Sequence, residues 1–563
     1  MPPSLALRPL EVTVTTDLIG CLAKEGGCRA LPARDLIPPN KGVATVDTST
    51  ALSGQQPNME LEIPSNLPLP ALGLIAVAVV YIISTILSYR RLSHIPGPWF
   101  SSISYLPMIA RQRSGRMNEQ YTAITARYGF GELARIGPND VLTADPDRIR
   151  HMSGTRSPYV KSGWYNIMNL DPDRQNGIGT LDTAVHDRFK AQTAKAYAGK
   201  DNSLLNPDLD AQVANLVASL RAKCRAGQHA DMGKLAQLFT LDSIAKVGFG
   251  EEFGNVREDR DVLGYGPVTS QNIPFLAMCG DVPWLRNVML APWPRRLMGP
   301  KETDESGIGK LLSLSFSVTK KIVATRFGPK AVERQDMLGS FIRHGLDQED
   351  CNAEVVFQII AGADTTATAI RATLLHIIGI PRVYSRLQAE IDAGIKEGRI
   401  SDEITLQEAK ALPYLQAVIQ EGLRIWPPFV GLVMKQVPKS GDTFKGVFLP
   451  EGTRVAHSTW AVTRNQEIFG DDAEMFRPER WLVEEQPDPE KRARMTRAAE
   501  LVFGYGRWQC SGKTVALLEL NKIFVQILRN FDLESANPAR PWVSESHNVW
   551  VQKDMWVKLT ERK

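Results

Sequence analysis

The chain has 563 residues, a formal net charge of +4 and a hydrophobic content of 43%. This nearly balanced charge gives no indication of nucleic-acid binding. The six cysteines are scattered without Cys-x-x-Cys pairs, so neither a disulfide scaffold nor a zinc site is indicated. No Pro/Gly/Ser-rich linker or long charge run divides the chain after Arg90. We therefore expect one large domain over residues 90–563, with enough chain to enclose a cofactor.

Residues 1–62 form a polar, turn-rich stretch without clear periodicity. Such a composition predicts a disordered N-terminal extension. Met59 stands directly before the anchor segment described next, and a start there would leave a short tail. In that alternative, the stretch upstream of Met59 is an artefact of gene prediction.

Residues 63–89 contain no charged side chain, and residues 71–83 are almost wholly apolar. About 20 apolar residues cross the hydrocarbon core of a bilayer as a helix, so we expect a transmembrane anchor here. Arg90 and Arg91 follow at once, which by the positive-inside rule places the C-terminal side in the cytosol. The segment is too long and too far from the N-terminus for a cleaved signal peptide. A core helix of the globular domain is the alternative.

Residues 350–378 have apolar side chains at helical spacing, which predicts a long buried helix. Within it, residues 361–366 read Ala-Gly-Ala-Asp-Thr-Thr. Glycine and threonine are poor choices inside a helix, and such departures from local rules are typical of functional sites. Small side chains let a planar group lie against the backbone, and a threonine hydroxyl bonded to a backbone carbonyl opens the helix for water. A close helix crossing is the alternative.

A second helix is predicted over residues 414–424, ended by Pro427 and Pro428. Glu421 and Arg424 lie three residues apart on it and are therefore neighbours on one face. By itself this pattern indicates an exposed ion pair that contributes little to stability.

Residues 503–512 read Phe-Gly-Tyr-Gly-Arg-Trp-Gln-Cys-Ser-Gly and precede an apolar-periodic helix. Cys510 is thus expected at the positive end of a helix dipole and near Arg507, and both lower the pKa of a thiol. The glycines let the backbone approach something flat. A lone cysteine in this context suits an axial thiolate ligand to haem iron. A buried structural cysteine is the alternative.

This run resembles the haem-binding signature of the cytochrome P-450 superfamily, Phe-Gly-x-Gly-Arg-x-x-Cys-x-Gly, with every fixed position present. The other signatures follow in the family's order, so the resemblance covers roughly residue 89 to the C-terminus. It implies a mainly α fold with a small β-rich lobe, behind a single N-terminal transmembrane helix. The cofactor that it implies is haem b with Cys510 as the axial ligand of the iron. Residues 95–99, Ile-Pro-Gly-Pro-Trp, resemble the family's proline-rich hinge after the anchor.

The resemblance assigns the catalytic acid–alcohol pair to Asp364 and Thr365, which would deliver protons during dioxygen reduction, with Thr366 as an auxiliary. It assigns Glu421, Arg424 and Arg480 to a buried charged triad that holds the haem-proximal core. Arg480 belongs to residues 476–481, Phe-Arg-Pro-Glu-Arg-Trp. Removing one member of such a triad leaves an uncompensated buried charge.

The two haem propionates need cationic or donor partners. Residues 182–190 resemble the helix that presents Trp-x-x-x-Arg to a propionate, with His186 and Lys190 in those two positions. Lysine is a point charge rather than a bidentate fork, so Arg188 is a possible substitute. Arg507 is the firmer candidate and Lys435 a weaker one; a solvated basic helix face is the alternative. The other predicted haem contacts are Ala361, Gly362, Phe503, Gly504 and Gly512.

The implied activity is monooxygenation, in which one atom of dioxygen enters a lipophilic substrate and the other becomes water. The predicted pocket is mostly apolar, which is consistent with a hydrophobic small molecule that a few polar groups orientate. The stretch 429–481 also resembles fungal members near the pisatin-demethylase-like branch, which favours secondary metabolite biosynthesis by analogy. The sequence names neither the substrate nor the oxidised position. The expected pocket residues are 164–178, Gln358, Ala361, Thr366, 429–434 and 547–550.

No flavin or nicotinamide fingerprint is found in the sequence, so electrons are expected from NADPH through a separate NADPH–cytochrome reductase. The resemblance places the chain in the endoplasmic reticulum membrane with its catalytic domain in the cytosol. A basic surface around Arg507 and Lys513 is expected to steer the acidic face of the reductase.

Two alternative functions stay open at this point. A haem-thiolate isomerase or dehydratase rearranges an oxygenated substrate without dioxygen or reductase, but such members commonly lose the acid–alcohol pair that is present here as Asp364 and Thr365. A non-enzymatic haem sensor or carrier has no need of the threonine-bearing groove. NADPH dependence of turnover separates the monooxygenase from the isomerase.

Overall fold

The computed structural model describes residues 68–128, 133–169, 175–294, 304, 309 and 318–563. The chain divides into two units, Met1–Pro68 and Leu69–Lys563. Of the first unit, Pro68 alone lies in the described ranges, so the predicted disorder of residues 1–62 falls outside them. All that follows concerns the second unit.

Helix α1 (Leu69–Arg91) occupies the predicted anchor segment. Within the described ranges it is the one helix that is long and apolar enough to cross a membrane, over Ala71–Arg91. The predicted first residues of the anchor, 63–67, lie outside the described ranges. At the C-terminal end of α1, the buried Arg135 guanidinium donates to the carbonyls of Ser88 (2.9 Å) and Tyr89 (3.1 Å). A cation at this position satisfies carbonyls that the helix leaves without partners.

The described helices after α1 are mostly bounded by proline or by capping side chains. Helix α13, for example, begins after Asp347, whose carboxylate accepts from the N–H of Asp350 (2.7 Å), and ends before Pro381. Their bounds are α2 (Leu106–Arg113), α3 (Met117–Tyr128), α4 (Pro146–Ser153), α5 (Thr183–Tyr197), α6 (Leu205–Arg225), α7 (Met232–Phe249), α8 (Tyr265–Asp281), α9 (Pro283–Leu290), α12 (Met337–Arg343), α13 (Gln348–Gly379), α14 (Pro381–Lys396), α15 (Leu406–Lys410), α16 (Pro413–Ile425), α17 (Thr459–Val462), α18 (Gln466–Phe469), α19 (Pro489–Ala499) and α20 (Lys513–Asn530), with 3-10 turns η1 (Trp99–Ser102), η2 (Gly163–Met168), η3 (Pro478–Trp481), η4 (Glu500–Phe503) and η5 (Gly506–Trp508).

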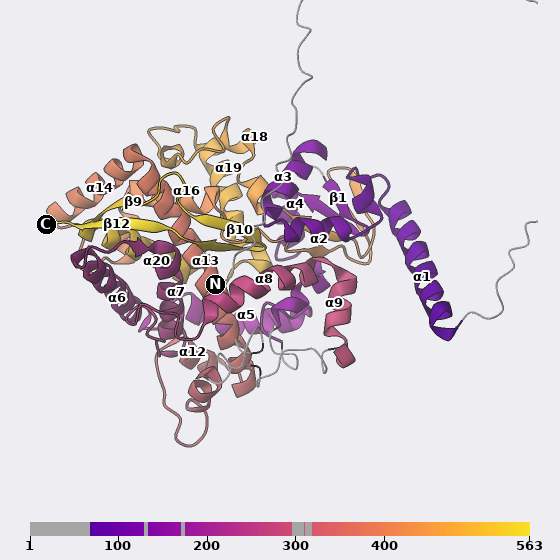
Figure 1. Ribbon diagram of the computed structural model, residues 1–563, viewed down its shortest axis with the longest axis horizontal. Helices are drawn as coiled ribbons and strands as arrows, with labels where there is room; N and C mark the ends of the chain where they lie inside the picture. Colours follow the sequence, from indigo (N-terminus) through magenta and orange to yellow (C-terminus); the bar gives the residue numbers. More distant parts are fainter. Residues whose placement is uncertain (1–67, 129–132, 170–174, 295–303, 305–308, 310–317) are drawn as a thin grey trace, which may run out of the picture. The chain divides into compact units, whose positions relative to one another are not determined.

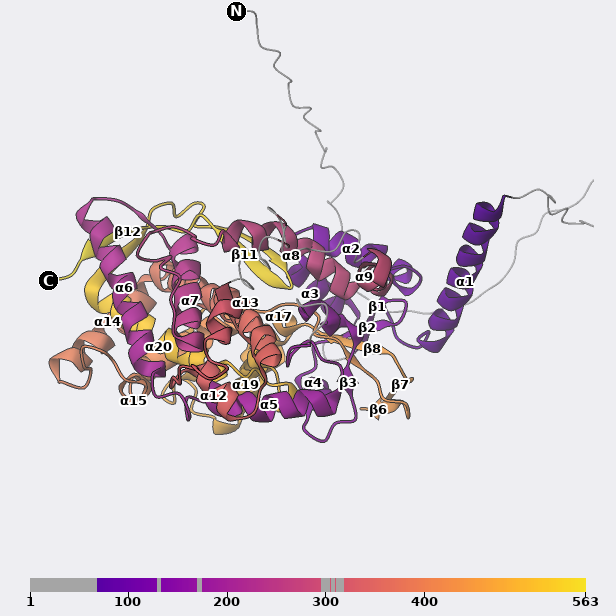
Figure 2. The same ribbon diagram turned by 90° about the horizontal axis from the view of Figure 1, so that it is seen from below.

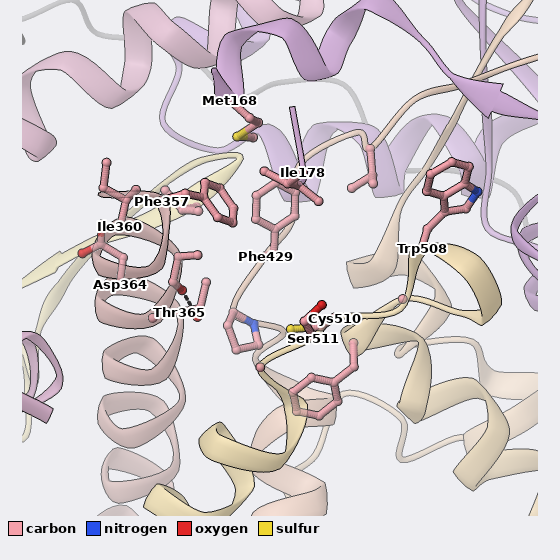
Figure 3. A pocket seen from close by; sticks show the side chains of 18 of the residues that line it. Met168, Ile178, Phe357, Ile360, Asp364, Thr365, Phe429, Trp508, Cys510 and Ser511 are labelled. Carbon is pink, nitrogen blue, oxygen red and sulfur yellow. Dashed lines mark hydrogen bonds between the residues drawn. The ribbon is translucent and has the colours of Figure 1, made fainter. Parts of the chain in front are cut away.

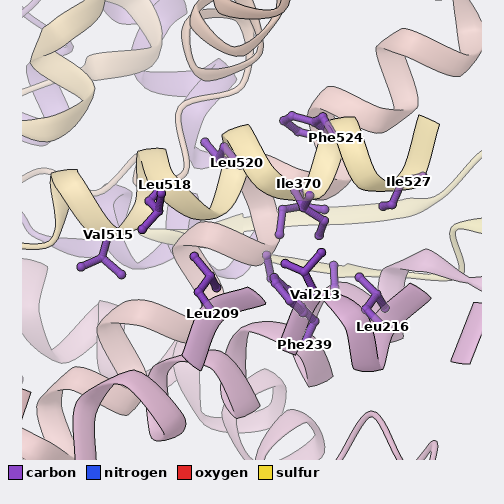
Figure 4. Close-up of a cluster of buried hydrophobic side chains, with 14 of the residues drawn as sticks. Leu209, Val213, Leu216, Phe239, Ile370, Val515, Leu518, Leu520, Phe524 and Ile527 are labelled. Carbon is purple, nitrogen blue, oxygen red and sulfur yellow. The ribbon is translucent and has the colours of Figure 1, made fainter. Parts of the chain in front are cut away.

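Helix α13 runs through the middle of this unit, and α7 and α20 pack against it (Figures 1 and 2). The core is formed by apolar side chains that these helices and α6 turn towards one another. Figure 4 shows this packing, in which Leu209 and Leu216 of α6 and Phe239 of α7 meet Ile370 of α13 and Phe524 of α20. All five side chains are buried, so the core fixes α20 relative to α13. Helix α13 carries the predicted segment 361–366, and α20 directly follows the Cys510 loop.

The β-structure is confined to small sheets. A five-stranded sheet has the order β1-β2-β8-β5-β3, in which β2 and β8 are parallel and the other neighbours antiparallel. A three-stranded sheet has the order β4-β12-β9, and β6–β7 and β10–β11 are hairpins. The strands are β1 (Leu133–Gly137), β2 (Asp140–Thr143), β3 (Val160–Lys161), β4 (Ala230–Asp231), β5 (Lys435–Gln436), β6 (Asp442–Phe444), β7 (Val447–Leu449), β8 (Arg454–His457), β9 (Phe531–Ser535), β10 (Val543–His547), β11 (Val549–Lys553) and β12 (Trp556–Glu561).

The prediction of a mainly helical fold with a small β-rich part is therefore confirmed. The two helices predicted from periodicity are also present: residues 350–378 fall within α13, and residues 414–424 within α16.

Candidate active site

Cys510 lies in the short loop between η5 and α20. Its N–H donates to the carbonyl of Phe503 (2.7 Å), which closes the loop. Gly504 has a φ of +71°, and a Cβ added there would come within 2.9 Å of the Trp508 carbonyl oxygen. Gly506 has a φ of +58°, and its Cβ would come within 2.5 Å of the Ser153 carbonyl oxygen. Both positions therefore need glycine because of backbone conformation and close backbone approach.

The Cys510 side chain lines a cavity inside the protein and is accessible from it. Burial raises the pKa of this thiol, while the N–H groups of Gly512 and Lys513 and the charge of Lys190 act in the opposite direction. The predicted lowering of this pKa is therefore wrong for the protein alone, because burial outweighs the helix N-terminus. The guanidinium of Arg507 lies 3.3 Å from the carboxylate of Asp187, and Arg507 is not among the largest influences on this pKa.

A cavity of about 490 Å³ separates the Cys510 loop from α13. Figure 3 shows Cys510 and Thr365 on opposite sides of it. Most of the wall is apolar, which suits a lipophilic molecule held by few polar groups. The described wall includes Met168, Ile178, Phe357, Ile360 and Phe429 (Figure 3), together with the predicted Gln358, Ala361, Thr366, Val433, His547, Asn548 and Val549.

The groove on α13 contains the predicted acid–alcohol pair. The hydroxyl of Thr365 donates to the carbonyl of Ala361 (2.7 Å), four residues earlier (Figure 3). From α7, the hydroxyl of Thr240 donates to the carbonyl of Ala363 (2.9 Å). Two carbonyls of the same turn thus accept side-chain hydrogen bonds, which is an arrangement that loosens a helix locally.

Gly362 has a second reason to be glycine. A Cβ there would come within 2.8 Å of the Ile244 side chain on α7. The alternative of a close helix crossing therefore explains this residue, which also lines the cavity beside Ala361.

Asp364 is buried, and both oxygens of its carboxyl group have partners. Oδ1 accepts from Nε2 of Gln237 on α7 (2.7 Å), and Oδ2 accepts from the hydroxyl of Tyr265 on α8 (2.9 Å). Burial raises the pKa of Asp364, while these two donors and the more distant Arg371 lower it. The carboxyl group is thus held mainly by neutral donors, so its protonated form costs less than in an ion pair.

The auxiliary Thr366 is buried, and its side chain lies near the carboxyl group of Glu519 on α20. Glu519 also lines the cavity, and burial raises its pKa to about 8. At neutral pH α13 therefore faces a protonated carboxyl group on the helix that follows Cys510.

Cations gather at one end of the cavity. The ammonium of Lys190 donates to the carbonyls of Arg507 (2.6 Å) and Gln509 (3.1 Å). The ammonium of Lys435 lies 2.5 Å from the Tyr165 hydroxyl and 4.6 Å from the centre of the Trp508 ring. Lys161, which the sequence analysis did not single out, lies 5.2 Å from the same ring and also lines the cavity.

The charges in this cluster are poorly compensated by the protein. Burial, and to a smaller extent repulsion from Lys190, lowers the pKa of Lys161 to about 7, although Glu354 and Asp187 oppose the shift. The pKa of Lys435 is lowered well below its ordinary value by burial and by Lys161 and Lys190. Such mutual repulsion is relieved by an anion between the ammonium groups.

His186 is buried beside this cluster, with its ring 4.6 Å from that of Trp508. Burial lowers its pKa to about 4, so the imidazole is neutral near pH 7. It lines the cavity, as do Lys190, Phe503, Gly504 and Gly512. The predicted propionate ligand Arg507 does not line it and is paired with Asp187 instead.

The predicted charged triad is assembled behind the loop. The guanidinium of Arg424 donates to both carboxylate oxygens of Glu421 (2.7 and 2.8 Å), and that of Arg480 donates to one of them (3.1 Å). The indole of Trp481 donates to the other oxygen (3.0 Å). None of the three charged side chains is exposed. Burial alone would raise the pKa of Glu421, but the two arginines hold it below its ordinary value.

A mainly helical fold in which a loop cysteine and a threonine-bearing helix face one cavity is typical of haem-thiolate proteins. The family model for "Cytochrome P450" matches residues 96–555. The chain therefore belongs to the cytochrome P450 family, as the sequence predicted.

Fungal enzymes of this family are among the relatives of the chain. It is 42% identical to cytochrome P450 monooxygenase ABA1 of Pyricularia oryzae, covering 87% of this chain and 96% of the relative. It is 35% identical to cytochrome P450 monooxygenase abl1 of Leptosphaeria maculans (83% and 82%) and 30% identical to pisatin demethylase of Fusarium vanettenii (81% and 88%). The predicted enzyme class, a monooxygenase, is confirmed.

The cofactor that the family implies is haem, and the residues around the cavity fit it. The thiol of Cys510 is open to the cavity, the opposite wall contributes Ala361 and Thr365, and the ammonium groups of Lys161 and Lys435 converge at one end. A thiol for the iron and cations for two carboxylates are the donor set that haem requires.

The sequence analysis missed Lys161, Gln237, Tyr265 and the α8 wall of the cavity. Lys161 stands alone in a two-residue strand, and α8 carries no signature. Gln237 and Tyr265 lie 127 and 99 positions from their partner Asp364 in the sequence. No local spacing therefore reveals these contacts.

Proposed function

We propose that this protein is a membrane-anchored monooxygenase that oxidises a lipophilic small molecule in fungal secondary metabolism. The observation that carries the proposal is the position of the Cys510 thiol across the cavity from Thr365. The apolar wall supports a lipophilic substrate. The relatives support the metabolic setting, since one of them is named for demethylation of pisatin.

In this proposal Cys510 would ligate the haem iron, and Lys161, Lys190 and Lys435 would hold the propionates together with the neutral His186. When bound, haem supplies dioxygen activation, with the thiolate donating electron density that favours O–O cleavage. The protein binds and orientates the cofactor. Glu421, Arg424 and Arg480 fix the segment behind the Cys510 loop rather than taking part in the chemistry.

Asp364 and Thr365 are proposed to manage protons at the distal wall. The Thr365 hydroxyl donates to Ala361 and keeps its lone pairs directed towards a proton donor on the cavity side. Asp364 is buried and held by neutral donors, so it can carry a proton near neutral pH. A positioned proton source of this kind is what the reduction of dioxygen to water requires.

The proposed location is the endoplasmic reticulum, with α1 as a single-pass anchor and the catalytic domain in the cytosol. Arg90 and Arg91 at the end of α1 support this orientation. Electrons are proposed to come from NADPH through a separate reductase. Arg507 and Lys513 are paired with Asp187 and Glu500, so we do not rest the docking face on these two side chains.

The proposed function can be tested with a deletion strain followed by an assay of the purified protein. Metabolite profiling of a strain that lacks the gene identifies the precursor that accumulates. That precursor is then given to the purified protein with NADPH–cytochrome reductase, with and without NADPH. We expect an oxygenated product that requires NADPH and dioxygen. Turnover of the precursor without either would contradict the proposal and favour an isomerase.

A further inference from the structure

A short turn of residues 176–179 forms part of the cavity wall. Gly177 and Ile178 line the cavity, and Figure 3 shows the Ile178 side chain among the apolar residues of the wall, together with Met168 and Phe429. Because the side chain of isoleucine is branched and stiff, its place in the cavity depends on the backbone that carries it. The hydrogen bonds of this backbone therefore help to decide which molecules fit.

The turn is shaped by its own segment of the chain. Oδ1 of Asn176 accepts from the N–H groups of Ile178 (3.1 Å) and Gly179 (2.6 Å). Nδ2 of Asn176 donates to the carbonyl of Met168 (2.7 Å), and Nδ2 of Asn169 donates to that of Gly179 (3.2 Å). These bonds stay within residues 168–179, so they fix the shape of the turn but not its distance from the core helices.

Two side chains of opposite charge type connect the turn to other elements. On one side, Oε2 of Glu354 on α13 accepts from the N–H of Gly177 (3.3 Å). On the other side, the ammonium of Lys161 on β3 donates to the carbonyls of Gly177 (3.2 Å) and Ile178 (2.6 Å). The backbone of the turn is thus held between an acid and a base, each of which meets the backbone group of the matching polarity. Hydrogen bonds with ionised partners are the stronger ones in proteins.

The acid is itself held in place. Glu354 is buried, and its Oε1 accepts from the hydroxyl of Tyr197 on α5 (3.0 Å). Both oxygens of the carboxyl group therefore have partners, and α13 is fixed by the core. Oε2 of Glu354 is thus a fixed point to which Gly177 is attached.

This arrangement is compatible with the proposed haem site. An ammonium group has three N–H donors, and the turn uses two of those of Lys161. The third can bind a propionate, so the cofactor and the turn share one cation. Glu354 has no proposed part in haem binding, and its substitution tests the attachment of the turn without removing a haem ligand.

We propose that Glu354 is a positioning residue that determines which size of molecule the cavity accepts. Together with Lys161 it clamps the backbone of Gly177 and Ile178 and so keeps the Ile178 side chain in the cavity. Without the acceptor, the N–H of Gly177 loses its partner, and such a group is costly to leave unpaired. The turn then moves away from α13, and the cavity becomes wider at Ile178. This inference rests on the proposed function and names what limits its substrate.

The test measures the affinity of two haem ligands for the full-length protein from the shift of the Soret band. Imidazole is the small ligand and phenylimidazole the large one, and the measured quantity is the Kd of phenylimidazole divided by that of imidazole. Ile178→Ala should lower this ratio roughly tenfold, which is the effect of a methylene group or two in an apolar pocket. Glu354→Met removes the acceptor at similar length and should also lower the ratio.

Two further variants separate the hydrogen bond from the charge. Glu354→Gln loses the charge but keeps an acceptor for Gly177, so it should retain the ratio of the unmodified protein. Glu354→Asp keeps the charge but is a methylene group too short to keep the bond, so it should lower the ratio. The matched control is Glu349→Met, which changes an exposed glutamate of the same helix outside the cavity wall and should leave the ratio unchanged.

A double variant shows whether Glu354 acts through Ile178. Ile178→Ala combined with Glu354→Met should have the ratio of Ile178→Ala alone, because the side chain that the clamp positions is no longer there. Independent, additive effects would overturn the proposal. So would a ratio that Ile178→Ala does not lower, or a Glu354→Gln variant that behaves as Glu354→Met does.

The two variants that break the bond also decide the outcome. If Glu354→Met fails to load haem, Glu354→Asp takes its place. The proposal is overturned if the ratio stays unchanged or rises in the variant that is measured. It is likewise overturned if neither variant loads haem, since a residue that only positions the wall is not required for haem binding.

Failure of the proposed function looks different. The reduced, carbon-monoxide-treated protein reports thiolate ligation through its red-shifted Soret band. If this band is absent from the unmodified protein, the assignment of Cys510 fails. If the band is present and the ratio does not respond to Glu354, the assignment stands and the role of Glu354 alone is wrong.

Discussion

The hydroxyl of Thr365 donates a 2.7 Å hydrogen bond to the carbonyl of Ala361, on the wall of the cavity that faces Cys510. The hydroxyl proton is thereby committed to the backbone, and the oxygen remains free to accept from a donor in the cavity. A threonine in this arrangement can receive and orientate a proton donor without becoming ionised itself.

Thr365→Ala should therefore uncouple the enzyme rather than stop it. Loss of a positioned proton path costs roughly 10²-fold in product formation, whereas NADPH oxidation should continue with release of hydrogen peroxide. The measurement is product and peroxide formed per NADPH, with the substrate identified from the deletion strain. Thr365→Ser keeps the hydroxyl and should restore coupling. An unchanged ratio in Thr365→Ala would make this residue a feature of helix packing.

Cys510→Ala should remove thiolate ligation, because no other described cysteine has its loop-to-helix position. Cys224 is half-buried on α6, and Cys279 and Cys351 are buried in α8 and α13. The reduced, carbon-monoxide-treated variant should lose the red-shifted Soret band. Cys224→Ala serves as the control and should retain it. Retention of the band by Cys510→Ala would refute the ligand assignment.

Haem retention should depend on pH through Lys161. Its pKa in the protein alone is lowered to about 7, so above that pH the ammonium loses its proton and must regain it to pair with a propionate. Haem binding therefore takes up a proton and weakens as pH rises, by up to about tenfold per pH unit for one group. The rate of haem transfer to apomyoglobin, measured between about pH 7 and 9, should rise with pH.

Lys161→Met removes this group at nearly constant volume, so the slope of the logarithm of that rate against pH should fall by about one. The control is Lys445→Met, whose ammonium is half exposed and paired with Asp145 away from the cavity. If both variants keep the slope of the unmodified protein, Lys161 does not face a propionate.

The parts of the site that depend on short spacings could be predicted from the sequence. The Cys510 loop needs glycines at fixed offsets, and Thr365 bonds to a carbonyl four residues away, so both leave a local pattern. Tyr265 and Asp364 lie 99 residues apart, and nothing near Tyr265 marks its partner. The cavity wall of α8 was missed for the same reason.

The charges and pKa values of the site also depend partly on local sequence and partly on distant segments. The helix N-terminus and Arg507 predict a lowered pKa for the Cys510 thiol, but burial has the larger effect and is a property of the whole fold. Arg507 is predicted to face a propionate, and in the structure its guanidinium lies 3.3 Å from the carboxylate of Asp187 on α5. Opposing charges brought in by distant segments cannot be read from a local motif.

Truncation should separate the anchor from the catalytic domain. The apolar side chains of α1 that would face lipid, such as Val77, Val80 and Ile83, are exposed and add nothing to the core. Deleting residues 1–91 should therefore release a haem-loaded domain from the membrane fraction. Deleting residues 1–58 should leave membrane association and activity unchanged. Loss of activity in the shorter deletion would show that the N-terminal stretch is required.

Glu421→Gln should be strongly destabilising. The two arginines beside it are fully buried and also donate to backbone carbonyls, so they cannot turn to solvent when the carboxylate is neutralised. Leaving such charges uncompensated costs about 3–5 kcal/mol in the free energy of unfolding. Because Glu421 is ionised through its two arginines in the folded protein, its contribution is present at neutral pH and is lost as pH falls through its lowered pKa.

The matched control is Glu119→Gln, which breaks the ion pair of Arg116 and Glu119. These two residues are also three positions apart, but both side chains are exposed. Chemical denaturation of the haem-free domain, followed by circular dichroism, should show a large loss for Glu421→Gln and no measurable loss for the control. The loss of stability should also depend on pH. Glu421→Gln should be less destabilising at acid pH, because the unmodified protein has lost the same charge there. Equal effects of the two substitutions at neutral pH would mean that burial of the triad does not determine the stability of this region.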